Sequence, residues 1–186
     1  LDVSSNNWKE YGDWMGDGPG FAKELAIGLS ANGALTSLNM SKNAMANKEA
    51  GKALADVLKT NTILTYLDVS ENAPYTSNDG PGFAEELAIG VSANGALASV
   101  NILNNNIGAE QAQNFVAILK EHPTLKSLCG NKGDETELDM SGKKMGADGA
   151  IMLAPEIVAN GALTSLNLSH NHLTRGKQTG GFGRYE

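Results

Sequence analysis

The side chains in this 186-residue chain that could support chemistry are few, and each stands in a pattern that favours a structural role. His170-Asn171-His172 has the composition of a nuclease-like string, but Asn171 also ends a recurring run, so we expect its side chain to point inward. Asp-Gly-Pro-Gly at 17–20 and 79–82 lacks the further ligands of a calcium loop, and no Gly-Lys-Ser/Thr follows for phosphate. It predicts a turn that leads into a helix.

Two further reactive residue types give no catalytic set. The single cysteine, Cys129, has no histidine at a spacing that suggests a dyad, and we expect a strand-end or buried thiol. His122 precedes Pro123 in a predicted turn. No nucleophile, base and acid can be combined, so we expect no enzymatic activity, no cofactor and no metal site.

The composition restricts the class of partner. A net charge of −7 and a pI near 5.0 argue against nucleic acid as a partner, because its phosphates bind to a basic protein surface. No apolar run reaches the ~20 residues of a membrane-spanning helix. One cysteine favours a reducing compartment, so we expect an intracellular protein, cytoplasmic or organellar.

A run of ten residues recurs along the chain. ALTSLNMSKN at 34–43 returns as ALTSLNLSHN at 162–171, with looser copies between. Aligned on their second apolar residue, the copies begin at Leu1, Leu38, Leu67, Val100, Leu138 and Leu166. Residues 1–186 are therefore expected to be a single domain of about six repeats, excerpted from a longer chain and uncapped at both ends.

Each unit has two halves. Alternation of polar and apolar residues, as in Ser37-Leu38-Asn39, predicts a strand, and Leu38 and Leu166 are expected to be buried. Apolar spacing predicts helices over 21–30, 48–59, 83–92, 109–120 and 147–158. Pro155 is expected to kink or shorten the last helix. Inserts are predicted at 8–16, 75–79 and, before the strand at Leu138, 129–137.

These units resemble leucine-rich repeats of the ribonuclease-inhibitor class, and their sequence is similar to repeats found in single-celled eukaryotes. The resemblance rests on the L-x-L-x-x-N runs and on EAGKALADVLKTNTILTYL at 49–67. It implies an α/β solenoid, a horseshoe arc with a parallel inner β-sheet and outer helices. It also implies that the Asn ending each run bonds to neighbouring backbone inside the turn, with Lys143 interrupting the row. The row is Asn6, Asn43, Asn72, Asn105 and Asn171.

The predicted inner face carries a column in which carboxylate and amide alternate. Its members are Asp2, Asn39, Asp68, Asn101, Asp139 and Asn167. A second column beside it holds serine except at Leu103. The columns are open to two interpretations: a mildly acidic groove for a basic peptide or cation, or a solvated polar row that keeps the sheet soluble.

Aromatic side chains concentrate in the inserts and are candidates for contact with a protein partner. We predict partner binding by Trp8, Tyr11, Trp14 and Tyr75, with Tyr66, Asp68 and Asp139 as a secondary surface. The leading hypothesis is a non-catalytic protein–protein interaction module or scaffold. One alternative is a structural subunit held in a large multiprotein assembly, and another is the leucine-rich segment of a regulatory or innate-sensor-type protein.

Overall fold

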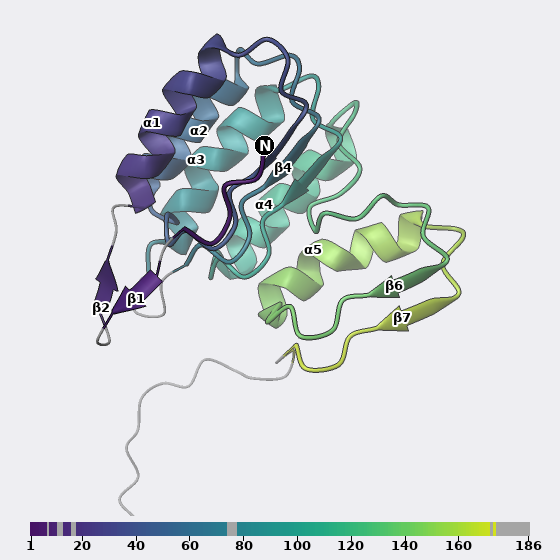
Figure 1. The fold of residues 1–186 in the computed structure, drawn as a ribbon. Coiled ribbons are helices and arrows are strands. Elements are labelled where there is room, and N and C mark those ends of the chain that lie inside the picture. Colours follow the sequence, from purple (N-terminus) through teal and green to yellow (C-terminus); the bar gives the residue numbers. More distant parts are fainter. Residues whose placement is uncertain (7, 11–12, 16–17, 74–77, 172, 174–186) are drawn as a thin grey trace, which may run out of the picture.

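The computed structural model describes residues 1–6, 8–10, 13–15, 18–73, 78–171 and 173. Strand and helix alternate through most of this part of the chain (Figure 1). The helices are α1 Gly18–Ala31, α2 Lys48–Leu58, α3 Gly80–Ala93, α4 Gly108–Glu121 and α5 Gly146–Ala159. The strands are β1 Trp8–Glu10, β2 Asp13–Met15, β3 Ser37–Asn39, β4 Tyr66–Asp68, β5 Ser99–Asn101, β6 Glu137–Asp139 and β7 Ser165–Asn167.

The helices form where the apolar spacing predicts them, each within three residues of the expected bounds. In α2 the side chain of Asn47 accepts a hydrogen bond from the Ala50 N–H at 2.9 Å, which satisfies one of the free amides of the first turn. Leu54 and Leu58 lie one turn apart on its buried face. Pro155 neither ends nor shortens α5, which continues to Ala159.

The parallel strands form two sheets rather than one. The first has the order β3-β4-β5, with Leu38, Leu67 and Val100 in register, and the second pairs β6 with β7. Residues 127–129 extend the first sheet, because Ser127 bridges Ser99 in parallel and Cys129 bridges Asn101.

The segment predicted as an insert at 129–137 does precede β6, but it follows a strand position that the sequence interpretation did not include. Leu128 takes the strand position after Val100, and the chain reaches β6 through 130–136 without an intervening helix. Ten residues separate Leu128 from Leu138, too few for a strand, a helix and a return. The missing helix breaks the sheet at this point.

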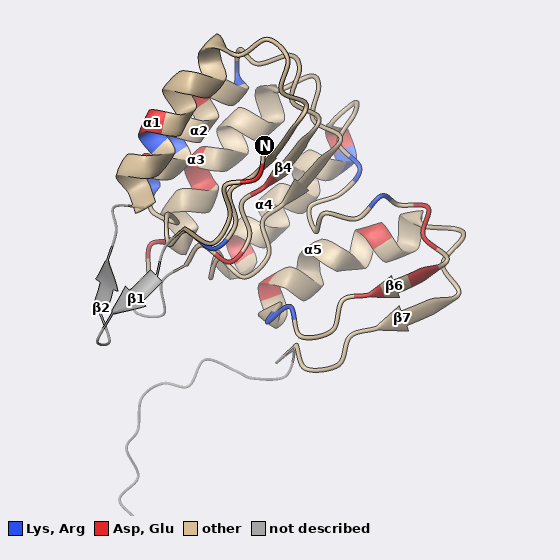
Figure 2. Cartoon of the chain, in the orientation of Figure 1, with Lys and Arg blue, Asp and Glu red and all other residues tan. Residues whose placement is uncertain are grey.

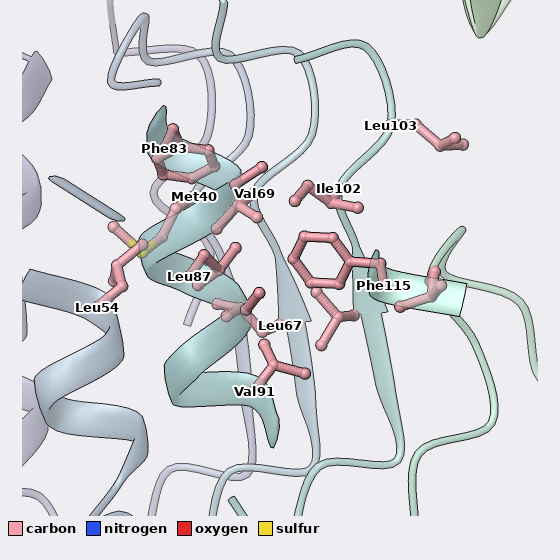
Figure 3. Close-up of a cluster of buried hydrophobic side chains, with 14 of the residues drawn as sticks. Met40, Leu54, Leu67, Val69, Phe83, Leu87, Val91, Ile102, Leu103 and Phe115 are labelled. Atoms are coloured by element: carbon pink, nitrogen blue, oxygen red, sulfur yellow. The ribbon is translucent and has the colours of Figure 1, made fainter. Parts of the chain in front are cut away.

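The core lies between the strands and the row of helices α1–α4 (Figures 1 and 3). Phe83 and Phe115 are the largest fully buried side chains and pack among aliphatic residues from several strands. Helices α2 and α3 approach closely at Gly90, where a Cβ would lie 2.4 Å from Ala55 Cα. Leucine at 38 is fully buried as expected, whereas Leu166 is only half-buried.

Leu103 packs differently from the rest of this core. It replaces the serine of the other units and is 3% exposed, at the border of the cluster drawn in Figure 3. Its Cδ2 lies 3.1 Å from the position that a Cβ on Gly149 would take. Leu103 thus packs against the start of α5. It links the first sheet to the part of the chain that contains α5 and the second sheet.

Candidate functional site

A groove of about 340 Å³ lies on the exposed strand face, across the break between the two sheets. The first sheet contributes Tyr66, Asp68 and Asn101, and the second contributes Asp139. Leu138 of β6 and Cys129 of the segment 127–129 also line it, and the turns after the strands supply the rest: Ser41, Lys42, Ser70, Glu71, Leu103, Gly130, Asn131, Met140 and Lys143. Three residues predicted as a secondary surface, Tyr66, Asp68 and Asp139, therefore line one groove.

Asp68 is the most heavily bonded side chain of this groove. Its Oδ1 accepts from Ser70 Oγ at 2.7 Å and from Ser70 N–H at 2.9 Å. Its Oδ2 accepts from Asn101 Nδ2 at 3.0 Å and from the Tyr66 hydroxyl at 3.4 Å. These bonds fix the carboxylate and hold the phenol at the groove surface.

The alternating column also has a local role in the fold. In every unit the Oδ1 of the column residue accepts a hydrogen bond from the N–H two residues later, in an Asx-type turn. The Oδ1–N distances are 2.9 Å at Asp2, 3.0 Å at Asn39, 2.9 Å at Asp68, 3.3 Å at Asn101, 2.8 Å at Asp139 and 3.0 Å at Asn167. Sequence reasoning missed this role, although the recurring Asx-x-Ser triplet was its signal.

The turns after these strands share a second feature. The residue before each Asn of the row adopts a left-handed backbone, with φ between 56° and 61° at five non-glycine positions: Ser5, Lys42, Glu71, Asn104 and His170. This conformation bends the chain sharply out of the strand. His170 therefore lies on a turn, next to the 2% exposed Asn171, and His172 lies outside the described residues.

The Asn row bonds across consecutive units. Asn72 Nδ2 donates to the Met40 and Val69 carbonyl oxygens at 3.0 and 2.8 Å, and its N–H donates to Asn105 Oδ1 at 2.8 Å. Asn43 and Asn105 make equivalent bonds to backbone oxygens. In the second sheet, Asn171 Nδ2 reaches back to Met140 O at 2.6 Å. The Asn6 N–H donates to Asn43 Oδ1 at 2.8 Å, which adds the first unit to the row.

Acidic and basic residues both line the groove, and the strands differ in charge: β6 carries red in Figure 2, whereas β7 is tan. Lys42 pairs with Glu71 at 3.4 Å on the first-sheet side. On the other side β6 carries two acidic residues out of three, whereas β7 carries none. Hydrogen bonds from Ser141, then the amide of Asn167 and the charge of Lys143, lower the pKa of Asp139.

Tyr66 differs from the other groove residues in its protonation. Burial, then the charge of Asp68 and its hydrogen bond, raise the pKa of Tyr66 to about 12. The phenol is therefore neutral at physiological pH and presents a hydroxyl beside a fixed carboxylate. An aromatic ring with a polar tip is the side-chain type that binding surfaces favour.

A buried carboxylate ends the first sheet. Glu156 of α5 is 6% exposed, and its Oε1 accepts from the Leu128 N–H at 2.6 Å and the Cys129 N–H at 3.1 Å. Its Oε2 accepts from Ser127 Oγ at 2.9 Å and Asn131 Nδ2 at 2.8 Å. The side chain thus takes the place that a further strand's carbonyl oxygens would occupy.

The sequence analysis did not identify Glu156, although its position on the buried stripe of a predicted helix was a signal. It follows Gly149, Met152 and Leu153 on the buried stripe of α5, where an acidic residue is out of place. The neighbouring Cys129 thiol is 4% exposed, as expected for a buried thiol. Its burial, followed by the charge and hydrogen bond of Glu156, raises its pKa.

The aromatic inserts are only partly described. Trp8 and Trp14 belong to the antiparallel pair β1–β2, where Trp8 is in register with Met15 and Trp14 with Lys9. Tyr11 and Tyr75 lie outside the described residues. Of the predicted contact residues, the structure therefore brings together Tyr66, Asp68 and Asp139, which share one groove.

Among the described residues, no group of three or more His, Cys, Asp or Glu could hold a metal ion. No described helix is long and apolar enough to cross a membrane.

Comparisons with known proteins give one family match, over part of the chain. The Leucine Rich Repeat family model matches residues 162–184, which contain β7. No curated protein matches the chain. Among solved structures, the chain is similar to leiomodin-1 actin-binding site 2, with 18% identity, a TM-score of 0.48, and coverage of 80% of this chain and 77% of that chain. This likeness is too distant to carry function. The family match is thus confined to residues 162–184, and the mixed α/β fold of helices and short parallel strands is consistent with leucine-rich repeats.

Proposed function

We propose that this chain is a leucine-rich-repeat solenoid of the ribonuclease-inhibitor class that binds another protein and carries no catalytic activity. The groove across the sheet break supports this proposal, because it gathers Tyr66, Asp68 and Asp139 from separate strands on one exposed face. Concave surfaces with a few fixed polar groups are common recognition sites.

The groove suits recognition more than turnover. Asp68 is held by hydrogen bonds from Ser70, Asn101 and Tyr66, so both of its carboxylate oxygens are already engaged within the chain. Tyr66 keeps its proton up to strongly alkaline pH. Preorganised side chains of this kind reduce the entropy lost on binding.

The Asn row has a different place in this proposal. Asn43, Asn72 and Asn105 are at most 2% exposed, and their side-chain amide groups donate hydrogen bonds to backbone oxygens. We assign them to the stacking of units, not to a partner. Trp8, Tyr11, Trp14 and Tyr75 remain proposed anchors of a second contact surface in the inserts.

The test compares partners recovered from native extract with matched variants. The double variant Tyr66→Ala/Asp139→Ala alters the groove, and Lys52→Ala alters α2, where the lysine side chain is 64% exposed. We expect the groove variant to recover any stoichiometric partner at least ~10-fold less well, because a central aromatic anchor is lost. Equal recovery by both variants contradicts a groove function, and loss only with Trp8→Ala/Trp14→Ala places the contact in the inserts.

A structural subunit of a larger assembly is a second candidate. The observation that favours it is apolar exposure on the helices: Ile27 is 64% exposed, Ile89 49% and Val158 87%. Such side chains fit contacts spread over the helical face. Ile27→Asp and Ile89→Asp are expected to release the chain from its complex while groove variants remain bound. Retention of both helix variants argues against this role.

A further inference from the structure

The outer edge of β6 has unused hydrogen-bonding groups. Met140 N–H donates to Asn167 O at 2.9 Å, and Thr136 O accepts from Ser165 N–H at 3.1 Å, so the even-numbered residues bond to β7. Alternation along a strand places the backbone groups of Glu137 and Asp139 on the opposite edge. In the part of the chain that the structure describes, those N–H and C=O groups have no recorded partner. An unpaired edge of this kind is a template for another strand.

The edge that ends the first sheet is closed, so the two edges at the break are not equivalent. Glu156 occupies the Leu128 and Cys129 N–H groups that a next strand would otherwise use. A strand arriving at the break therefore finds acceptors and donors only on β6.

The β6 edge is also accessible. Glu137 and Asp139 are exposed, and Leu138 is half-buried, whereas the central residues of β3, β4 and β5 are fully buried. Leu138 and Asp139 both line the groove across the break. The opening that defines the proposed function thus runs along the unpaired edge.

Charge specifies the side chains that an added strand should carry. Glu137 and Asp139 point to the same face, and their neighbours on β7 are the neutral Ser165 and Asn167. Among the described residues, neither acid forms an ion pair. Opposite charges on directly facing strand positions stabilise pairing, and like charges oppose it.

This charge pattern argues against a second copy of the chain as the occupant. The outward positions of β3, β4, β5 and β7 carry Ser, Tyr, Asn or Asp, and no strand from β3 to β7 carries a basic residue. None of these strands therefore offers a positive charge to Glu137 or Asp139. A partner strand with Lys or Arg at alternate positions complements Glu137 and Asp139.

We propose that β6 binds an extended segment of a partner protein, which adds to its open edge as a strand with basic side chains at alternate positions. The proposal rests on the groove function above and names the partner's chemistry and mode of binding. Backbone hydrogen bonds supply the affinity, and the two acids select the basic pattern.

The probe is a capped ten-residue peptide that alternates Lys with Val, measured by fluorescence anisotropy against the whole chain. Three control peptides separate its contributions: Glu in place of Lys, the same composition with all lysines adjacent, and backbone N-methylation along one edge. We expect binding of the alternating Lys peptide, and at least ~10-fold weaker binding of each control.

The matched variants are Glu137→Pro and Glu137→Gln. Both remove the charge, but only proline removes the N–H on the open edge, and no intramolecular hydrogen bond is lost. We expect Glu137→Gln to weaken binding about two- to five-fold and Glu137→Pro at least ~10-fold further. Because the methylated peptide is tested on the unaltered chain, the proposal stays testable if the proline variant unfolds.

The outcomes separate this proposal from the groove function. Equal binding to Glu137→Pro and Glu137→Gln, no loss on peptide methylation, or no binding of the probe overturns strand addition. If Tyr66→Ala/Asp139→Ala still loses the native partner in that case, the groove function stands. If the native partner is also retained by that variant, both proposals fail.

Discussion

The two sheets are built from the same repeating sequence but are stabilised differently. Leu38, Leu67 and Val100 at the centre of the first sheet are fully buried, whereas Leu138 and Leu166 in the second are half-buried. The Asn row runs through successive units of the first sheet, while Asn171 reaches back to a unit whose row position is Lys143.

The difference arises at the connection between them. A strand at 127–129 passes to β6 without a helix, so nothing stacks the next strand beside it. Glu156 and Leu103 hold the two parts together, one through hydrogen bonds and the other through packing. A repeat chain can therefore break its sheet by omitting one helix and closing the exposed edge with a side chain.

The largest effect is expected at this closure. Glu156→Ala leaves the Leu128 and Cys129 amides without their acceptor and should lower the free energy of unfolding by about 3–5 kcal/mol. Chemical denaturation measures it. Glu156→Gln, which keeps the shape but not the charge, should cost about 2 kcal/mol. A loss below about 1 kcal/mol for the alanine variant would mean that the carboxylate does not close the edge.

Equivalent leucines sharpen the comparison between the sheets. Leu38→Ala should cost about 2–5 kcal/mol, because the side chain is fully buried. Leu166→Ala, from a half-buried site, should cost about 1–2 kcal/mol. Urea unfolding of both variants tests this, and equal losses would show that the second sheet is as well packed as the first.

Part of this architecture could be predicted from the sequence. Spacing of apolar residues located all five helices within three residues, because each buries one face against a strand. Leu128 escaped prediction because Leu-Cys-Gly lacks the second apolar residue of the other runs. Alignment on the residue six positions earlier would have found it, since Asn94, His122 and Asn160 precede Val100, Leu128 and Leu166 by the same interval.

The groove could be predicted only in part. Alternation placed Tyr66, Asp68 and Asp139 on one face, and they share the groove. The sequence did not reveal that Asp68 also accepts two bonds from Ser70 and one from Tyr66, because these depend on the local backbone and side-chain geometry. It also did not reveal the sheet break, which depends on a helix that is missing.

His122 provides a smaller test of the same alignment. Its Nδ1 accepts from the Leu125 N–H at 2.9 Å, as Asn94 Oδ1 accepts from the Leu97 N–H at 2.8 Å. His122→Asn should therefore retain stability within about 0.5 kcal/mol, and His122→Ala should lose about 1–2 kcal/mol. Thermal melts distinguish the two. Similar losses in both variants would show that His122 is not equivalent to the asparagines.

The last prediction concerns Tyr66, whose contribution to stability is lost only at alkaline pH. Its pKa of about 12 lies above that of an unfolded tyrosine, near 10, so the folded chain holds the proton more tightly. The resulting stability is complete below pH 10 and is lost as the pH rises through about 12. Ultraviolet titration of the chain and of Tyr66→Phe should differ by one late-titrating phenol. A phenol that titrates near 10 and disappears in Tyr66→Phe contradicts the bond to Asp68.

Amide hydrogen exchange at the two edges tests the sheet break most directly. We predict slow exchange at Leu128 and Cys129, which bond to Glu156, and at Leu138, which bonds to β7. Glu137 and Asp139, on the open edge of β6, should exchange much faster than Leu138 between them. Protection of Glu137 and Asp139 equal to that of Leu138 would mean that another strand already covers this edge, and would contradict the account.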